Sequence, residues 1–413
     1  MIARVRGTED ILDLKLHNFI IDKIRKHLQR YNFSEIQTPI LEKTELFVRS
    51  LGQETDVVTK EMYTFETEGG DKICLRPEAT AGTVRAFLEN KIEQTPWKVW
   101  SYGSMFRHER PQKGRWRQFS QINMEVINSS SVSEDCLFLK MLDRFFSKDL
   151  SLENYVLKIN FLGCLDDREK HKSELKKYVD VQKDKICETC LVRKEKNILR
   201  IFDCKNESCQ KIYKDAPKIT DYLCSESESE WNQIQECLDL LSVNYIHDFS
   251  LVRGLDYYNG IVFEFSSRDL GAQNAFCGGG RYELAKALGS KKEYPSIGCA
   301  IGLGRLMLLL ETVIEKLDIP NEKKLVAIIP MAKEQNLLSL LIADKLQFNE
   351  LSIDVLLDDA SIKSKMRRAN KIGASHVLII GEEEQKNNTV SIKDMKTGES
   401  QSVKQGDIVK YFK

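Results

Sequence analysis

The residues after Pro320 alternate between short apolar runs and longer amphipathic segments, and this alternation limits the possible folds more than any other feature. Short apolar runs predict strands, and apolar residues that recur every three or four positions predict helices. We expect strands at 325–329, 353–357, 376–380 and 389–394, helices at 333–349 and 362–371, and a short helix at the end. Such alternation is typical of an α/β unit with its own core. Pro320 and Asn321 are the predicted linker before it.

The residues before about position 160 have a different pattern. A first helix is predicted by apolar residues at every fourth position, namely Leu12, Leu16, Ile20, Ile24 and Leu28. Pro39 marks extended chain beyond it. The segments 72–75, 98–102 and 120–127 are typical of strands in a sheet with one polar face. Residues 98–127 are predicted to form one long hairpin, because their middle, 108–117, is polar and contains Pro111 and Gly114.

A segment of distinct composition separates these two parts. Residues 163–245 are rich in lysine, glutamate and cysteine and contain the acidic run 225–230. We interpret 164–245 as a mainly helical insertion into a first domain that spans residues 1–320, which closes with a helix at 305–317. The α/β unit, at 323–413, is the second domain.

The composition excludes several classes of protein. Of the 413 residues, 42% are hydrophobic and 30% charged, unlike a collagen-like, disordered or disulfide-scaffold chain. No apolar run approaches the roughly 18 residues of a membrane span. The first residues are charged and carry no export sequence, so we expect the eleven cysteines to be reduced thiols or metal ligands in the cytoplasm. The chain has 62 Lys and Arg residues and 62 Asp and Glu residues, so its formal net charge is zero. A nucleic-acid site must therefore be a local basic patch.

The predicted hairpin tip, residues 106–119, is the densest cluster of functional side chains. It holds five Lys or Arg residues and one carboxylate. Arginine binds phosphate oxygens with two parallel hydrogen bonds, and a neighbouring aromatic ring suits a purine base. A solvated hairpin tip is the alternative interpretation of this segment taken alone.

Two further clusters contain polar groups beside apolar chain. In 75–82, Pro77 sets a turn, and Glu78 and Thr80 are acceptors suited to an ammonium group; alternatively Thr80 only caps a helix. In 251–260, Arg253 lies in a largely apolar stretch that includes two tyrosines, 257 and 258, and must be paired or functional if it is buried. A structural pair between Arg253 and Asp256 is the alternative.

A fourth cluster consists of glycines. Three are consecutive, at 278–280, and three others, at 298, 302 and 304, are expected on one face of a strand that ends at Arg305 and a helix. Glycine lets the backbone approach a ligand closely. The spacing fits neither a dinucleotide-binding fingerprint nor a P-loop.

Together the four clusters resemble the histidyl-tRNA synthetase family of class II aminoacyl-tRNA synthetases over nearly the whole chain. The matching motifs are 6–10, 75–82, 105–119, 121–125, 251–259 and 278–282. The sequences Met-Phe-Arg-His-Glu-Arg-Pro-Gln-Lys-Gly-Arg and Leu-Val-Arg-Gly-Leu-Asp-Tyr-Tyr are specific to this family. The resemblance implies an α+β fold: an antiparallel sheet with flanking helices, the helical insertion, and a C-terminal α/β domain that binds the anticodon.

The resemblance also implies the reaction, which joins L-histidine to its tRNA in two steps. The histidine carboxylate attacks the α-phosphate of ATP and releases pyrophosphate, and the histidyl group then passes to the 3′ end of the tRNA. The carboxylate is already ionised at neutral pH, so catalysis is mostly positioning and charge stabilisation. Such a site is expected to be rich in arginine and poor in histidine, and the chain has only six histidines.

Residue roles follow from the matching motifs. The catalytic residues implied are Arg107 and Arg253. Histidine is expected to contact Glu78, Thr80, Arg107, Gln121, Glu125, Arg253, Tyr257, Tyr258 and Tyr282. ATP, with Mg²⁺ on its β- and γ-phosphates, is expected to contact Arg107, Glu109, Arg115, Phe119 and Arg305, and tRNA to contact Arg110, Gln112 and Arg117.

The remaining expectations concern partners. The resemblance implies a homodimer joined around the first helix and Pro39, with the insertion near the acceptor stem and no membrane association. In the second domain, 362–371 carries five basic residues, suited either to phosphate contact or to a solvated helix face. A non-catalytic regulatory or tRNA-sensing paralogue is the alternative function, and a general nucleotide-binding α/β protein is a third.

Two features depart from the general pattern. Most class II members carry an acidic residue where this chain has Gly304, so either the family tolerates glycine there or the ATP site is weakened. The insertion contains Cys187, Cys190, Cys204 and Cys209, two close pairs with the spacing of a structural Cys₄ zinc site. Four free thiols are the alternative.

Overall fold

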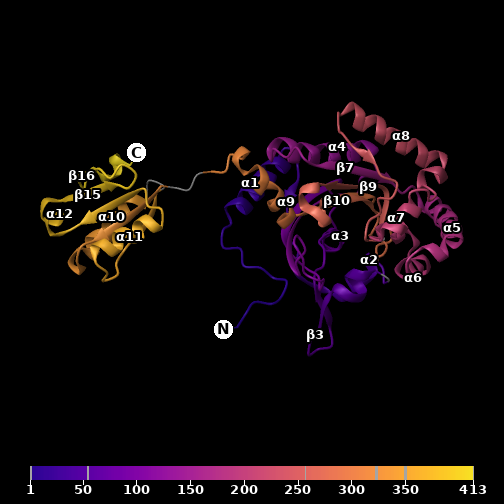
Figure 1. Cartoon of the computed structure of the whole chain (residues 1–413), viewed down its shortest axis with the longest axis horizontal. Helices are drawn as coiled ribbons and strands as arrows, with labels where there is room; N and C mark the ends of the chain where they lie inside the picture. The colour runs from indigo at the N-terminus through magenta and orange to yellow at the C-terminus, as the bar shows by residue number, and fades with distance from the viewer. Residues whose placement is uncertain (1, 54, 256, 321–323, 348–350, 413) are drawn as a thin grey trace. The chain divides into compact units, whose positions relative to one another are not determined.

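The computed structural model divides the chain into two compact units, residues 1–319 and 320–413. It describes residues 2–412 except 54, 256, 321–323 and 348–350. Each unit has its own sheet and its own core (Figure 1). The second unit begins at Pro320, the first residue of the predicted linker. Asn321, its other residue, lies outside the described residues.

The first unit is built on an eight-stranded sheet in the order β1-β5-β6-β11-β10-β9-β7-β8. The strands are β1 (Ser34–Glu35), β5 (Trp97–Phe106), β6 (Gln118–Ile127), β7 (Val156–Phe161), β8 (Ile246–His247), β9 (Tyr258–Ser266), β10 (Ala275–Tyr282) and β11 (Ser296–Gly302). All neighbours are antiparallel except the two short edge strands, which pair in parallel. The predicted antiparallel sheet is therefore confirmed.

The predicted long hairpin is formed by β5 and β6. Its register runs from Trp97 opposite Ile127 to Phe106 opposite Gln118, so the strands are longer than the predicted 98–102 and 120–127. The tip between them is polar, and an isolated bridge joins Gln112 to Arg115. Because side chains alternate between faces along a strand, β6 buries one row of apolar residues and directs the other row to the opposite face.

Helices pack against the sheet and bury the main core. They are α1 (Lys15–Gln29), α4 (Val132–Arg144), α8 (Ser225–Leu240) and α9 (Leu303–Leu310), with a π-helical turn at Phe145–Asp149. A further helix, α3 (Thr80–Glu89), packs in a second apolar cluster. The predicted first helix is correct except for Leu12, which precedes α1 and is 96% exposed. The predicted helix 305–317 is wrong in extent, because α9 gives way to a kinked 3₁₀ segment, Glu311–Lys316.

A separate three-stranded sheet lies beside the main one. Its order is β2-β4-β3, with β2 (Leu41–Lys43), β3 (Tyr63–Glu66) and β4 (Lys72–Leu75). The predicted strand 72–75 is thus confirmed as a strand, but it belongs to this small sheet. Two helical segments complete the region, α2 (Thr44–Leu51) and the π-helical segment η1 (Val57–Glu61).

The insertion is helical, as predicted. It contains α5 (Leu165–Val181), α6 (Glu188–Lys196), α7 (Glu207–Tyr213), α8 (Ser225–Leu240) and the 3₁₀ segments η3 (Lys183–Lys185), η4 (Ile198–Asp203) and η5 (Ile219–Tyr222) (Figure 1). Its part from α5 to α7 has a core of its own, in which Leu175, Val179 and Ile201 pack with three cysteines of the predicted metal set. Helix α8 packs into the main core instead.

The second unit is a five-stranded α/β structure in the order β13-β12-β14-β15-β16. Its elements are β12 (Leu325–Pro330), α10 (Asn336–Gln347), β13 (Ser352–Val355), α11 (Ile362–Lys371), β14 (His376–Ile380), α12 (Glu382–Asn387), β15 (Thr389–Asp394), β16 (Ser400–Lys404) and α13 (Ile408–Tyr411). The predicted bounds of α11, β14 and β15 are reproduced. A 3₁₀ turn at Lys333–Gln335 precedes α10, and the predicted helix end Asn349 lies outside the described residues.

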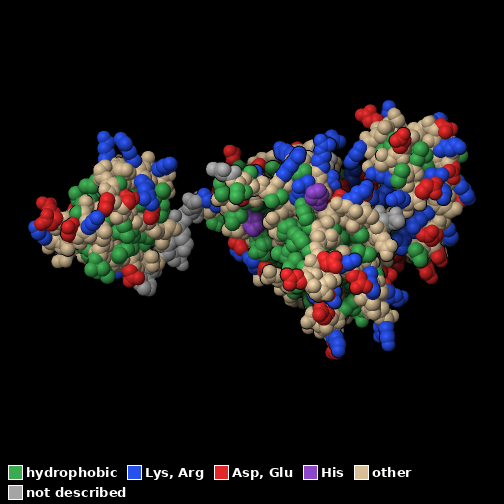
Figure 2. All heavy atoms as spheres, turned by 90° about the horizontal axis from the view of Figure 1, so that it is seen from below, with side chains coloured by type: hydrophobic (Ala, Val, Ile, Leu, Met, Phe, Trp, Pro, Cys, Tyr) green, Lys and Arg blue, Asp and Glu red, His purple; other side chains and the backbone are tan. Residues whose placement is uncertain are grey.

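Two elements of the second unit were not predicted. The expected charged turn after β14 contains the short helix α12, and β16 pairs with β15 at the sheet edge. Within the described part of the chain, no helix is long and apolar enough to cross a membrane. Figure 2 shows basic and acidic side chains interspersed on the face drawn, and the chain has equal numbers of the two.

Candidate active site

A cavity of about 490 Å³ opens over β6, β10 and β11 and is bordered by the hairpin tip and η1. Most of the predicted site residues line it: Glu78, Thr80, Arg107, Glu109, Arg115, Phe119, Gln121, Arg253, Tyr257, Tyr258 and Arg305. These residues come from segments far apart in the sequence, which the sheet brings to one face. Glu125 and Tyr282 lie beside the cavity and connect to it through Thr80.

Two glycines of the sheet make room for long polar side chains. A Cβ atom on Gly298 would overlap the Glu125 carboxylate, and one on Gly278 would overlap the Arg253 guanidinium. Both glycines belong to strands in the middle of the sheet. Because glycine has no Cβ atom, the side chains of Glu125 and Arg253 can lie directly against the backbone at these two positions. Gly304 was predicted on the same strand face, but it lies in the first turn of α9.

Glu125 is the centre of a buried polar group. The Thr80 hydroxyl donates to one of its carboxylate oxygens and the Tyr282 hydroxyl to the other, each over 2.7 Å. The Glu125 side chain is almost wholly buried. Burial raises the pKa of Glu125 to about 8, against the opposing effect of these two hydrogen bonds. A carboxyl group with such a pKa exchanges a proton near neutral pH.

Glu78 holds the start of α3. Its carboxylate accepts hydrogen bonds from the backbone N–H groups of Thr80 (2.6 Å) and Ala81 (2.9 Å). Burial raises the pKa of Glu78, and these backbone donors oppose the rise. The alternative in which Thr80 caps the helix is wrong, because the Thr80 side chain donates to Glu125 and the free N–H groups of the first turn are bound by Glu78.

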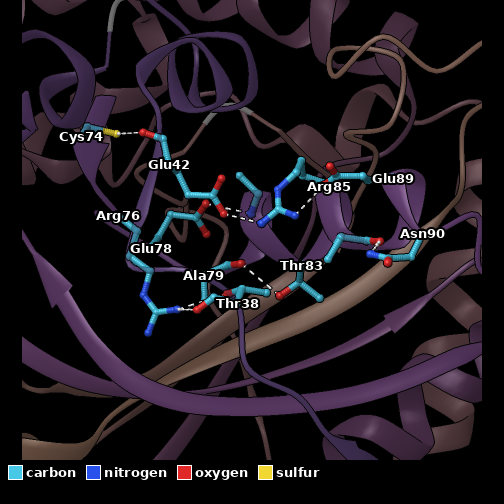
Figure 3. Close-up of polar contacts among 12 residues, drawn as sticks. Thr38, Glu42, Cys74, Arg76, Glu78, Ala79, Thr83, Arg85, Glu89 and Asn90 are labelled. Atoms are coloured by element: carbon cyan, nitrogen blue, oxygen red, sulfur yellow. Dashed lines mark hydrogen bonds and ion pairs between the residues drawn. The ribbon is translucent and has the colours of Figure 1, made fainter. Parts of the chain in front are cut away.

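Side chains that do not line the cavity anchor the loop that carries Glu78 (Figure 3). The buried Arg76 side chain donates to the carbonyl and hydroxyl oxygens of Thr38, both at 3.1 Å, and to the Ser104 carbonyl. Arg85 of α3 pairs with Glu42 at 2.5 Å and with Glu89 at 2.9 Å. These contacts tie the loop to β5 and to the small sheet, so Glu78 and Thr80 are held on a rigid support.

Five arginines line the cavity, and four of them are predicted site residues: Arg107, Arg115, Arg253 and Arg305. Arg107 Nε donates to the Pro77 carbonyl at 2.9 Å, and its guanidinium lies 5.6 Å from the centre of the Phe119 ring. Arg305 donates to the carbonyls of Gly114 and Ala275. Burial lowers the pKa of Arg305, and the charges of Arg115 and Arg107 lower it further. This accumulation of positive charge favours a polyphosphate.

Two of these arginines have carboxylate partners. Arg253 pairs with Glu264 of β9 at 3.1 Å, a partner that the sequence did not indicate. The alternative partner Asp256 lies outside the described residues. Arg115 pairs with Glu109. The carboxylate that is expected to face the adenine therefore lies against an arginine that is expected to bind the phosphates.

Gln121 and Asn123 line the cavity with unsatisfied polar atoms. The Gln121 carbonyl oxygen and the Asn123 amide nitrogen are buried and have no hydrogen-bond partner. A buried unpaired polar group costs roughly 1–3 kcal/mol, so each is suited to a ligand that completes it. Asn123 was not predicted individually, although its position two residues from Gln121 on a strand places both on the same face.

Gly304, the glycine at a usually acidic position, faces Trp116 of the hairpin tip. A Cβ atom there would lie 2.9 Å from the indole ring. The ring thus occupies the space that a longer side chain would need. This contact between α9 and the hairpin explains in steric terms why glycine stands at this position.

The residues expected to contact tRNA lie at the hairpin tip. Arg110 and Gln112 are exposed. Arg117 is half-buried: its Nε donates to the Glu109 carbonyl at 3.2 Å, and a terminal nitrogen lies 3.4 Å from the Arg6 carbonyl. In α11 of the second unit, Lys363 and Arg367 are exposed, but Lys365 is buried and donates to the Pro330 carbonyl, so it does not belong to a phosphate-contacting surface.

The four cysteines predicted as metal ligands come together in the insertion. The sulfur atoms of Cys187, Cys190, Cys204 and Cys209 all lie within 4.8 Å of one another. Backbone N–H groups point at two of them: that of Cys187 at the Cys209 sulfur and that of Asn206 at the Cys204 sulfur. A second set, Cys164, Asp167 and Cys224, meets the same distance limit at the base of the insertion.

Comparison with protein-family models matches residues 13–306 to the model described as histidyl-tRNA synthetase. Residues 325–413 match the model of an anticodon-binding domain. The boundary between the two structural units, between residues 319 and 320, lies in the stretch between the two matches.

Individual relatives agree with the family models. The histidine–tRNA ligase of Thermosipho melanesiensis is 43% identical over 99% of this chain and 98% of its own length. That of Clostridioides difficile is 39% identical with the same coverage. Among solved structures, apo histidyl-tRNA synthetase of S. aureus superposes with a TM-score of 0.82 at 33% identity over 100% of both chains.

Proposed function

This chain belongs to the histidyl-tRNA synthetase family and ligates L-histidine to its tRNA with ATP, and we propose a role for each group of residues in its cavity. The relatives matched over their full length are histidine–tRNA ligases, and none of these comparisons supports the alternative of a regulatory paralogue. The second unit is an anticodon-binding domain. The proposals below concern the residues that perform each step.

The first proposal is that Arg107 and Arg253 stabilise the transfer of the adenylyl group. The histidine carboxylate forms a bond to the α-phosphorus, and the bond from that phosphorus to the bridging oxygen breaks as pyrophosphate leaves. No proton moves in this step, so the cavity must supply positive charge and orientation. The observation that carries this proposal is that five arginines line one cavity, four of them predicted site residues.

The second proposal places ATP on Arg115, Arg305 and Phe119, with Glu109 at the adenine. The ion pair between Glu109 and Arg115 orients both side chains. The residues present fit Mg²⁺ only as an ion delivered with the nucleotide, because no three carboxylates cluster in the described lining. Bound to the phosphates, Mg²⁺ would neutralise the charge of the leaving pyrophosphate.

The third proposal assigns histidine recognition to Glu125 and its surroundings. Glu78, Thr80 and Gln121 would bind the α-ammonium group, and Glu125, Tyr258 and Tyr282 the imidazole. Tyr257 packs on Tyr258 at 4.6 Å between ring centres and holds its ring. A site that hydrogen-bonds both ring nitrogens leaves its own groups unpaired with an apolar substrate, and such sites discriminate by about 10⁴–10⁵.

The fourth proposal concerns tRNA and assembly. Arg110, Gln112 and Arg117 would read the acceptor end from the hairpin tip. A homodimer would form around α1 and Pro39, where Ile40 and Leu41 are exposed apolar residues beside the edge strand β1. The proposed compartment is the cytoplasm, where the eleven cysteines would be reduced thiols or metal ligands.

The fifth proposal is a structural zinc ion bound by Cys187, Cys190, Cys204 and Cys209. Four sulfurs within 4.8 Å of one another match the ligand set of a closed tetrahedral site. Three of these cysteines are buried in the small core of the insertion, where a shared ion would join η4, α6 and α7.

Substitution of Glu125 by alanine tests the histidine pocket. We expect the KM for histidine to rise by at least a hundredfold in pyrophosphate exchange, with the KM for ATP within threefold of the wild type. The Phe119→Ala variant is the matched control and is expected to reverse this pattern. Equal effects of Glu125→Ala on both substrates would reject the assignment of this pocket.

A further inference from the structure

The insertion reaches the active-site cavity through one side chain, that of Arg200. Arg200 belongs to η4 and is the one residue of the insertion among the described residues that line the cavity. Its side chain is 22% exposed. An arginine from a separate helical subdomain thus lies in the wall of the cavity in which histidine is activated.

Arg200 forms an ion pair with Asp56, which immediately precedes η1. A terminal nitrogen of Arg200 lies 2.8 Å from the Asp56 carboxylate, and Asp56 also lines the cavity. The Asp56 side chain is 46% exposed. Ion pairs of this exposure contribute about 0–1 kcal/mol to stability, so the pair adds little to folding. Its consequence is geometric, because it fixes η1 to the insertion.

From η1 the contacts lead to the catalytic arginine. The Glu61 carbonyl, at the end of η1, accepts the backbone N–H of His108 at 2.6 Å. His108 follows Arg107 directly, and the Glu61 carboxylate also acts on Arg107 electrostatically, raising its pKa against the larger lowering effect of burial. Val57 is buried in the apolar cluster that includes Tyr257 of the cavity wall. Movement of η1 would therefore displace residues at the histidine end of the site.

On the other side, η4 is held firmly within the insertion. Ile201, next to Arg200, is fully buried in the core of the insertion. The backbone N–H of Cys204 donates to the Ile201 carbonyl at 3.0 Å, which places one of the four clustered cysteines directly after η4. The position of Arg200 is thus set by the packing of the insertion around its cysteines.

We propose that Arg200 is a positioning residue for histidine activation: through Asp56 the insertion holds η1, and with it Arg107, in the catalytic arrangement. The inference rests on the proposed role of Arg107. It assigns the insertion a part in the first step of the reaction, before tRNA binds. The competing interpretations are a solvated ion pair without consequence and direct contact of Arg200 with a substrate.

The test is histidine-dependent pyrophosphate exchange by the full-length protein without tRNA. We expect Arg200→Ala and Asp56→Ala each to lower kcat about tenfold, with the KM for ATP within twofold and the unfolding midpoint unchanged. Charge reversal would set an acid at position 200 against Asp203 and a base at position 56 against Lys60, so the double variant Arg200→Ala/Asp56→Ala is used instead. It is expected to lower kcat no further than either single variant, because all three remove the same contact. Lys176→Ala, which removes the exposed pair with Glu195 inside the insertion, is the matched control and should match the wild type.

Three outcomes would overturn the proposal. Single variants with wild-type kcat would make the pair inconsequential. Losses of kcat that add up in the double alanine variant would mean that Arg200 or Asp56 contacts a substrate directly. A rise in the KM for histidine or ATP with unchanged kcat would also mean that Arg200 or Asp56 contacts a substrate directly. Arg107→Ala tests separately the proposed role of Arg107 on which the inference rests. If that role is wrong, Arg107→Ala keeps the exchange activity of the wild type whatever the Arg200 variants do.

Discussion

The Tyr282 hydroxyl donates a 2.7 Å hydrogen bond to the Glu125 carboxylate inside the wall of the cavity. The two residues are separated by more than 150 positions in the chain and meet because β6 and β10 both flank β11. Thr80 satisfies the other oxygen, so the carboxylate is fixed in orientation before any substrate binds. The ionised form, which Glu125 reaches when it loses its proton near pH 8, is a preorganised acceptor for a ring that donates an N–H group.

The raised pKa of Glu125 predicts a pH-dependent stability of the substrate-free protein. An unperturbed glutamate has a pKa of about 4.3, whereas burial raises that of Glu125 to about 8. Between these values the folded state binds a proton that the unfolded state has lost, so stability falls as pH rises. The Glu125→Gln variant has no titrating group at this position, so its stability does not fall for this reason as pH rises.

The measurement is the free energy of unfolding of the wild type and of Glu125→Gln, in denaturant, from pH 5 to pH 9. We expect the advantage of the glutamine variant to grow up to about pH 8 and then to level off. All other titrating groups are shared and cancel in the difference. A difference that does not change with pH would show that Glu125 ionises normally.

The close approach at Gly298 predicts an effect on histidine binding. Gly298→Ala places a methyl group on the Glu125 carboxylate, and forcing extra volume into a packed site typically costs about 1–3 kcal/mol. We expect the KM for histidine to rise at least tenfold. Gly302→Ala on the same strand is the control, because its Cβ meets no atom closer than 3.8 Å. Equal KM values for the two variants would contradict the steric explanation.

Gly304 and Trp116 are predicted to be coupled. Gly304→Ala pushes the indole, which lies in the wall that contains Arg115 and Arg305, and we expect a severalfold higher KM for ATP. In Trp116→Ala the space is open, so Gly304→Ala should then have little further effect. Residues in contact give non-additive free energies, and a double-mutant cycle on the KM for ATP measures this coupling. Additive effects would mean that the contact is irrelevant.

The cysteine cluster predicts one zinc ion per chain. Protein purified without a polyhistidine tag should contain about one zinc by elemental analysis, and Cys204→Ser should lose it and unfold at a lower temperature. Cys237→Ser, in the same insertion but outside both cysteine clusters, is the control and should keep the metal. Less than about 0.2 zinc per chain in the wild type would establish four free thiols instead.

Local patterns in the sequence were sufficient for elements whose limits depend on their own residues. The spacing and flanking residues of α11, β14 and β15 gave the observed bounds, and the polar middle of 98–127 identified the hairpin. Leu12 shows the limit of such patterns: it continues the apolar spacing of α1 but precedes the helix, since spacing does not show which residues find a surface to cover.

Long-range contacts decided what the sequence alone did not reveal. Residues 72–75 form the predicted strand, but their neighbours, β2 and β3, place it in the small sheet. Glu264 pairs with Arg253 only after β9 has brought its side chain to the cavity. The contact of Arg200 with Asp56 joins segments more than 140 residues apart, and neither residue belongs to a recognised motif.

The most direct test of the central claim is the exchange of labelled pyrophosphate into ATP by the wild type and by Arg253→Ala. We predict exchange that requires histidine, is not supported by other amino acids, and falls at least a thousandfold in kcat in the variant. Lys177→Ala, at a side chain that is 70% exposed, is the surface control and should have normal activity. An Arg253→Ala protein that is folded and exchanges at the wild-type rate would show that this cavity does not activate histidine by the charge stabilisation proposed here.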